Sequence, residues 1–250
     1  MLLEMTKKTK DQDDIAKKPA QPLIWLAGRC RRGLRLLRNI LIVSLTLATV
    51  FVLLFRAVNP PTSIYIASEW WRLNEIKRDW TPIKNFPPYV ARSVVAAEDA
   101  NFCLHAGFDF EQIKAALSGK GKLRGASTLS QQTSKNVFLW QGRSWLRKGL
   151  EAGFTVLVEL IWPKIRIVEV YLNVAEFDEG VFGVAAAGQH YFGVKPDKIT
   201  RLQAARLAAI LPNPKNRSAS RPSSQVRKRT SQILSGEATI EADGRAKCFQ

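Results

Sequence analysis

The feature that most constrains this chain is an uncharged apolar run from Asn39 to Phe55, NILIVSLTLATVFVLLF. Its 17 residues lie at the short limit for a membrane span, because a helix rises about 1.5 Å per residue and the hydrocarbon core is about 30 Å thick. Arg38 and Arg56 can extend their charged ends to the interface, and two further apolar residues follow Arg56. We therefore predict an uncleaved transmembrane anchor over residues 39–58.

Two other readings of this run are less favoured. A buried core helix rarely lacks charged residues over such a length beside a basic cluster. A cleaved signal peptide normally has a short leader and a small-residue cleavage site, and no such site follows the run.

Flanking charge predicts the orientation of the anchor. Five arginines precede the run: Arg29, Arg31, Arg32, Arg35 and Arg38. Within about twenty residues on the other side lie two, Arg56 and Arg72. Positive charge stays on the cytoplasmic side, so we predict a cytoplasmic basic tail over residues 1–38, disordered in its first part, and a remainder outside the cytoplasm.

Charge and cysteine usage narrow the function classes. The chain has 38 basic and 21 acidic residues, a net charge of +17, which implies an anionic partner such as nucleic acid, phospholipid or a phosphorylated substrate. Cys30, Cys103 and Cys248 are far apart, and their spacing indicates neither a disulfide framework nor a zinc site. Two histidines and no HExxH motif argue against metal-hydrolase chemistry.

The rest of the chain is typical of a mostly α-helical protein. Apolar residues recur at helical spacing from Tyr89 almost to Ile233, and no alternating strand pattern is visible. We predict a helical domain over residues 86–233, preceded by a linker or membrane-proximal segment over 59–85. A polar C-terminal tail over 234–250 completes the prediction.

The stretch from Val94 to Asp109, VVAAEDANFCLHAGFD, carries the strongest chemical signal. It predicts an apolar helix that ends in two adjacent acids, Glu98 and Asp99. A carboxylate at the end of an apolar run is partly desolvated, which raises its pKa and makes it a better base near neutral pH. Acid pairs at helix ends are, however, usually solvated caps or ion-pair partners, so other evidence has to decide.

Four short blocks together supply that evidence. They are EDANFCLHAGFD from Glu98 to Asp109, RGASTLSQQ from Arg124 to Gln132, RKGLE from Arg147 to Glu151, and KIRIVEVYLN from Lys164 to Asn173. Taken singly, each has a structural explanation. Asp109 and Thr128 each precede a glutamine by three residues and suit helix caps, and Arg147 and Glu151 are spaced for an ion pair.

In this order and spacing the blocks resemble the glycosyltransferase domain of bacterial peptidoglycan synthases. That family carries ED-x-x-F-x-x-H-x-G, G-G-S-T-I-T-Q-Q, R-K-x-x-E and K-x-x-I-x-E-x-Y-L-N patterns, and the likeness extends over residues 86–214. The second pattern is varied mildly here, with Ala126, Leu129 and Ser130 in place of glycine, isoleucine and threonine. No Ser-x-x-Lys or Lys-Thr-Gly motif of a transpeptidase follows. The chain therefore resembles the monofunctional members of the family, the biosynthetic peptidoglycan transglycosylases.

The resemblance implies a fold and a reaction. The fold would be a mostly α, lysozyme-like glycosyltransferase domain after one N-terminal transmembrane helix, held in the bacterial inner membrane with its catalytic domain in the periplasm. The substrates would be lipid II, a lipid-linked disaccharide-pentapeptide, and the growing lipid-linked glycan. Polymerisation would proceed by an inverting displacement of undecaprenyl diphosphate. Other cell-wall synthesis or division proteins would be partners, and nucleic acid would not.

Residue roles are carried over by the same resemblance. Glu98 matches the family's base, and Glu151 matches its second acid, placed near the diphosphate or its metal. The expected substrate-binding residues are Asp99, Ser127, Thr128, Gln131, Gln132, Lys135 and Arg143. No protein metal ligand is expected, but a divalent cation, Mg²⁺ or Mn²⁺, at the diphosphate is left open.

Two rival classes remain at this point. A lysozyme-like hydrolase would also need two carboxylates on a helical scaffold, but it would not need an anchor or cations placed for a diphosphate. A membrane-anchored binder of nucleic acid or anionic lipid would explain the charge, but not Glu98, Gln132 and Glu151 in the register of the family.

Overall fold

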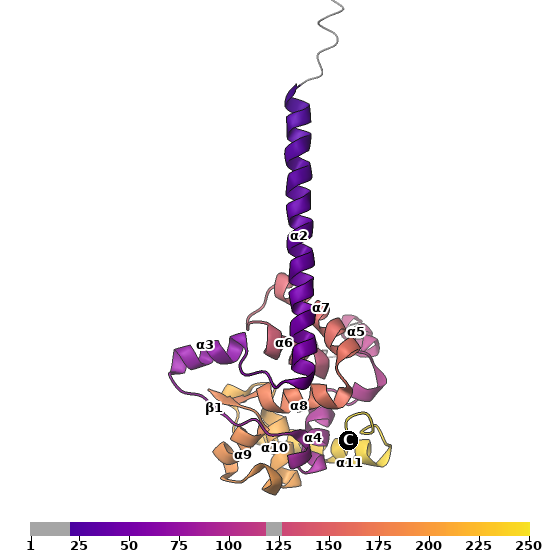
Figure 1. Cartoon of the computed structure of the whole chain (residues 1–250). Helices are drawn as coiled ribbons and strands as arrows, with labels where there is room; N and C mark the ends of the chain where they lie inside the picture. Colours follow the sequence, from indigo (N-terminus) through magenta and orange to yellow (C-terminus); the bar gives the residue numbers. More distant parts are fainter. Residues whose placement is uncertain (1–20, 119–126) are drawn as a thin grey trace, which may run out of the picture. The chain divides into compact units, whose positions relative to one another are not determined.

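The computed structural model describes residues 21–118 and 127–250, with side chains from residue 31 onward except those of 116 and 117 (Figure 1). The chain divides into two units, residues 1–50 and 51–250. The predicted mostly helical fold with one N-terminal apolar helix is confirmed. The helices are α2 (Gln21–Ala57), α3 (Ile64–Leu73), α4 (Pro88–Glu98), α5 (Phe110–Leu117), α6 (Leu129–Phe138), α7 (Trp145–Ile161), α8 (Lys164–Val174), α9 (Val184–Phe192), α10 (Arg201–Ile210) and α11 (Ser224–Ala242). Short 3-10 turns are η1 (Ile83–Asn85), η2 (Phe102–Leu104), η3 (Pro196–Lys198) and η4 (Pro214–Asn216).

Helix α2 contains the predicted anchor and is longer than the uncharged run. Of the helices that the structure describes, it is the one long and apolar enough to cross a membrane, over Arg31–Ala57. Most of its described apolar side chains are exposed, among them Leu41 at 68% and Leu45 at 57%. Water disfavours such a surface and lipid does not, so α2 fits a membrane anchor.

The second unit is built from two groups of packed helices. Helices α4, α10 and α11 pack against one another, and α6 packs against α7 and α8 (Figure 1). Helix α8 is the most buried, and Ile167, Val168 and Leu172 are fully inaccessible to solvent. The carboxyl end of α4 and the amino end of α6 are joined by contacts described below, and this junction positions the candidate site.

A small sheet was not expected from the sequence. The strands are β1 (Lys77–Arg78), β2 (Glu176–Asp178) and β3 (Val181–Phe182), in the order β1–β3–β2. The β1 strand is parallel to β3, and β2 is antiparallel to it. Two or three residues are too few to show an alternating pattern. The first strand lies in the predicted linker, which also contains α3 and buries Ile66 in the core.

The predicted polar tail over 234–250 is largely helical and packed. Helix α11 continues to Ala242, and Phe249 near the end of the chain is 1% exposed. The buried face of α11 is spaced by three and four residues and mixes polar with apolar side chains: Val226, Thr230, Ile233, Glu237 and Ile240. Glu237 is buried because Arg92 of α4 donates to it at 2.6 Å. The hydropathy pattern therefore did not reveal the part of this helix that follows Ile233.

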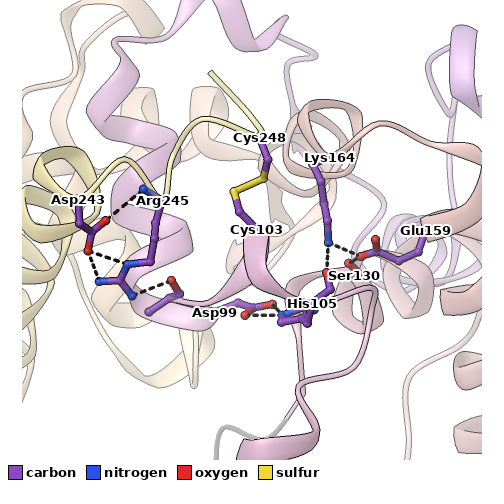
Figure 2. Close-up of a disulfide and its surroundings, with 10 residues drawn as sticks. Asp99, Cys103, His105, Ser130, Glu159, Lys164, Asp243, Arg245 and Cys248 are labelled. Carbon is purple, nitrogen blue, oxygen red and sulfur yellow. Dashed lines mark hydrogen bonds and ion pairs between the residues drawn. A yellow bond between two sulfur atoms is a disulfide. The ribbon is translucent and has the colours of Figure 1, made fainter.

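A disulfide joins Cys103 to Cys248, across 145 residues of sequence, with their Cα atoms 5.7 Å apart (Figure 2). The spacing of the cysteines did not indicate a disulfide. The bond connects the loop that follows Glu98 to the C-terminal segment, two parts of the chain whose proximity depends on the packing of α11 against α4.

Candidate active site

Glu98 is the last residue of α4 and the centre of the site. Its side chain is 13% exposed. The side-chain amide of Gln132 donates to Oε2 at 3.0 Å, and Arg229 donates to Oε1 at 3.4 Å. Burial raises the pKa of Glu98, and the Gln132 hydrogen bond and the Arg229 charge act against that rise. Glu98 is thus a largely buried carboxylate with a raised pKa, as the sequence predicted, and it accepts from two neighbouring side chains.

Tyr171 sets the orientation of Gln132. Its hydroxyl, on buried α8, donates to Gln132 Oε1 at 3.1 Å, so the amide nitrogen is turned toward Glu98. Burial raises the pKa of Tyr171 well above its usual value, and the charge of Glu98 adds to this rise, so the hydroxyl stays a donor. Three residues from three helices therefore form one chain of hydrogen bonds that ends on Glu98.

Asp99 points into the protein. It is 3% exposed. His105 Nε2 lies 2.9 and 3.1 Å from its two oxygens, and the Leu129 amide donates to Oδ2 at 2.8 Å. Asp99 therefore ties the loop after Glu98 to the first turn of α6, where a negative charge is favourable. A direct substrate contact by Asp99 stays a prediction.

The start of α6 is a capping box, as the sequence predicted. The Thr128 hydroxyl accepts from the Gln131 amide, and Gln131 Oε1 accepts from the Thr128 amide at 3.0 Å. The Thr128 hydroxyl also donates to the Gly107 carbonyl at 2.6 Å. Gly107 has a φ of +86°, and a Cβ there would lie 2.8 Å from the Thr155 methyl group, so only glycine suits this approach.

Not all of the second block can be placed. Arg124, Gly125 and Ala126 lie outside the described residues. Ser127 is the first residue after that gap, and its carbonyl accepts from the side-chain amide of Gln132 at 3.4 Å. The predicted substrate contacts of Ser127, Thr128, Gln131 and Gln132 remain predictions, and the structure shows the last three engaged with neighbouring protein groups.

Lys135 lies farther along α6 and is half-buried. Burial lowers the pKa of Lys135, and the charges of Glu151 and Glu98 act against that fall. In the part of the chain that the structure describes, no hydrogen bond or ion pair engages the Lys135 ammonium. A partly buried ammonium without a bonded partner is suited to bind an anion. Gln132 and Lys135 are three residues apart on one face of α6, so Glu98, which accepts from Gln132, lies against the face of α6 that carries this cation.

Glu151 is enclosed by neighbouring protein groups. It is 3% exposed on α7. Arg147 donates to it at 2.6 Å, and Lys148 pairs with its other oxygen. Arg147 also donates to the Gly142 carbonyl at 2.7 Å, which fixes the loop before α7. Arg143 is exposed in that loop.

Polar side chains of the fourth block bind the segment that precedes α4. Glu169 accepts from Arg166 at 2.6 Å and from the Ile83 amide at 2.9 Å. Asn173 accepts from the Thr81 amide at 2.8 Å and donates to the Thr81 carbonyl at 2.9 Å. These side chains fix the segment before α4 to α8.

The described residues offer no built metal site. No group of three or more His, Cys, Asp or Glu side chains is placed to hold an ion within residues 21–118 and 127–250. The Glu151 oxygens are already paired with Arg147 and Lys148. A Mg²⁺ or Mn²⁺ ion at the diphosphate stays a prediction.

Sequence reasoning missed two residues of this site. Arg229 comes from α11, in a stretch with several other basic residues and no motif, and nothing local marks it. Tyr171 belongs to the fourth block, and its position in that block was the available signal.

Comparison with known proteins identifies the family. A family model described as Transglycosylase matches residues 66–237. The chain belongs to the transglycosylase family. A relative from Jannaschia sp., named biosynthetic peptidoglycan transglycosylase, is 55% identical over 203 residues, which cover 81% of this chain and 84% of that one. Relatives of the same name from Chromohalobacter salexigens and Caulobacter vibrioides are 50% and 46% identical over 87% and 86% of this chain, and 97% and 96% of their own.

The transglycosylase match includes every site residue described above, from Glu98 to Arg229. It ends within α11, so Cys248 lies beyond it.

Proposed function

We propose that this chain is a peptidoglycan glycosyltransferase that polymerises lipid II into β-1,4-linked glycan strands. One observation carries the proposal: the buried Glu98, with its raised pKa, and the half-buried Lys135 lie on the same side of α6 in a member of the transglycosylase family. A base beside an anion-binding group is what transfer of a sugar from a diphosphate requires.

The reaction is a single displacement. The 4-hydroxyl of an incoming lipid-linked disaccharide attacks the anomeric carbon of the growing chain, and Glu98 takes the hydroxyl proton. The new glycosidic bond forms as the bond to the diphosphate oxygen breaks, and the configuration changes from α to β. The diphosphate leaves as a stable anion, so it needs cationic stabilisation more than a proton.

Lys135 and Arg143 stabilise the leaving diphosphate in this proposal. Lys135 is fixed on α6, and Arg143 is free to reach from the exposed loop before α7 with a planar fork suited to phosphate. Glu151 holds Arg147 and Lys148 in place nearby. Its role is electrostatic, because both its oxygens are already paired.

We place the enzyme in the bacterial inner membrane, with the catalytic unit in the periplasm. The arginines before the apolar run support this orientation. The Cys103–Cys248 disulfide supports it independently, because disulfides persist outside the reducing cytoplasm. Lipid II and the growing glycan, both anchored in that membrane, are the partners. Contacts with other wall-synthesis or division proteins are a further expectation.

The test is polymerisation of labelled lipid II by the full-length protein in detergent. We expect glycan polymer from the unchanged protein and at least about a hundredfold less from Glu98→Gln, which keeps the shape of the side chain but not its basicity. Circular dichroism establishes that the variant is folded. Release of muropeptides from finished wall, without polymer, would identify a hydrolase instead. A variant that keeps more than about a tenth of the rate would refute Glu98 as base.

A further inference from the structure

The loop that follows the base is attached covalently to the end of the chain. We call residues Asp99–His105 the base loop and residues Ser224–Gln250 the C-terminal segment. Figure 2 shows the disulfide between Cys103 of the base loop and Cys248 of the C-terminal segment. Beside it, the rings of Phe102 and Phe249 lie 6.2 Å apart, and both are buried.

Arg245 adds polar contacts on the same side. It donates to the Ala100 carbonyl at 3.2 Å, two residues after Glu98. Asp243 accepts from its guanidinium at 2.7 Å and fixes its direction (Figure 2). The end of the chain therefore holds the beginning of the base loop as well as its middle.

Lys164 holds the base loop from α8. Its ammonium lies 4.2 Å from the centre of the Phe102 ring and donates to the His105 carbonyl at 2.7 Å. Glu159 pairs with Lys164 at 2.9 Å and also accepts from Ser130 of α6 (Figure 2). On this side all the described contacts are noncovalent, whereas the C-terminal side adds a covalent bond to its noncovalent contacts.

The same C-terminal segment also reaches Glu98 directly. Arg229 of α11 donates to the Ala97 carbonyl at 3.1 Å and to Glu98. Helix α11 packs closely on α4, where a Cβ at Gly236 would lie 3.4 Å from the Ala96 methyl group. One segment thus places a charge on the base at one end and fastens the loop after it at the other.

We propose that the Cys103–Cys248 disulfide is a positioning element for Glu98, so that the enzyme reaches full activity only in its oxidised form. This inference rests on the proposed function, in which Glu98 is the base. The two thiols lose two protons and two electrons to a disulfide oxidant, RS–SR, which becomes two RSH, and the Cys103–Cys248 bond forms. Transfer in the opposite direction from a dithiol reductant breaks it.

The physical reason is control of the surroundings of the base. Without the bond, the end of the chain can leave the base loop, and water then reaches Glu98. Glu98 is faced by charged or titratable groups from its own loop and from three other helices: Asp99, Lys135, Tyr171 and Arg229. Burial is the largest influence on the pKa of Glu98, and hydration weakens that influence. The pKa of Glu98 therefore falls, and its side chain is held less firmly.

The experiment uses full-length Cys30→Ser protein, in which the two bonded cysteines are the only ones left. Thiol alkylation under denaturing conditions should find two protected cysteines before reduction and two reactive ones after it. Polymerisation of labelled lipid II is measured on the oxidised protein, on the protein reduced with dithiothreitol, and on the same sample reoxidised with oxidised glutathione. Cys248→Ser in the same background gives a second reduced state without added reductant.

We expect reduction to lower kcat about tenfold or more, the scale of a small misplacement of a catalytic group. The KM for lipid II should change little, because the contacts described for the base loop and the C-terminal segment involve neither Lys135 nor Arg143. The acidic limb of the rate profile should move to lower pH, and reoxidation should restore both kcat and that limb. Cys248→Ser should behave like the reduced protein and should not respond to oxidant.

A purely structural disulfide gives a different result. The unfolding temperature would fall on reduction, while kcat and the pH profile, measured below that temperature, would stay the same; this outcome overturns the proposal. Loss of folded structure at every assay temperature, seen by circular dichroism, overturns it too. Glu98→Gln in the oxidised background is the control for the function itself. If it stays active, the base assignment fails, whatever the disulfide does.

Discussion

At the scale of single residues, the site combines groups that are unfavourable for the fold. Glu98 is buried with a raised pKa, and Lys135 is half-buried with a lowered one. Both shifts arise first from burial, so each charged form is less stable here than in water. Such groups are typical of sites shaped for reaction rather than for stability.

The first prediction concerns Glu98 and stability. In acid, below the pKa of an unfolded glutamate at about 4.3, the carboxyl is neutral in both states and its burial is harmless. As the pH rises through the raised folded pKa, the buried group ionises and stability is lost. Glu98→Gln cannot ionise, so we expect it to be more stable than the unchanged protein by about 0.5–2 kcal/mol near neutral pH. In acid the difference should shrink.

Thermal unfolding across pH, followed by circular dichroism, measures this difference. Glu75→Gln is the matched control. Because Glu75 is exposed, Glu75→Gln and the unchanged protein should unfold at similar temperatures at every pH. Equal stability of Glu98→Gln and the unchanged protein near neutral pH would show that Arg229 and Gln132 fully offset the burial.

The second prediction separates diphosphate binding from base catalysis. Charge on the leaving diphosphate grows in the transition state, so Lys135→Ala should lower the polymerisation rate about a hundredfold or more. Arg143→Lys should also impair it, because an ammonium lacks the bidentate fork. Lys195→Ala, an exposed lysine outside the site, should have no effect. Steady-state rates at fixed detergent and salt decide, and equal behaviour of Lys135→Ala and Lys195→Ala would place the diphosphate elsewhere.

At the scale of elements, the site depends on where helices begin and end. Helix α4 stops at Glu98, and α6 starts at Thr128 with a capping box. Asp99 joins the two ends through the Leu129 amide. The ends of α4 and α6 thereby fix the distance between the base and the face of α6 that carries Gln132 and Lys135.

The third prediction tests that junction with two matched caps. Thr128 of α6 and Thr200 of α10 both form capping boxes. Replacing either by Ala should cost about 1 kcal/mol of stability, the usual value of a lost cap. Thr128→Ala should also reduce activity, because Thr128 binds the Gly107 carbonyl beside the base loop. Thr200→Ala should keep full activity. Chemical denaturation measures the stability of both variants, and polymerisation rates measure their activity. If Thr128→Ala kept full activity, the Thr128 cap would not be a positioning contact.

At the scale of the whole molecule, the fourth prediction concerns topology. A reporter that works only outside the cytoplasm should be active when fused after Gln250 and silent when fused before Met1. The reason is the excess of arginine before the apolar run. The opposite pattern would overturn both the orientation and the function, because a domain facing the cytoplasm could not meet lipid II on the outer face.

Much of this protein follows from local sequence. The apolar run, the capping residues around Asp109 and Thr128, and the end of an apolar helix at Glu98 all depend on neighbours within a few residues. Helix periodicity and capping act over that same range. The mostly helical fold, the anchor candidate and the position of Glu98 at the end of a helix could therefore be predicted.

The long-range partners of Glu98 and of its neighbours could not be predicted. Arg229 meets Glu98 across 131 residues of sequence, Tyr171 meets Gln132 across 39, and Cys103 joins Cys248 across 145. Residues 234–250 looked like a polar tail because the part of α11 that they contain buries Glu237 as well as Ile240. Only the packing of α11 against α4 and α10 gives Glu237 its partners, Arg92 and Arg201. Such contacts depend on how helices far apart in the sequence pack together, and no local pattern encodes that arrangement.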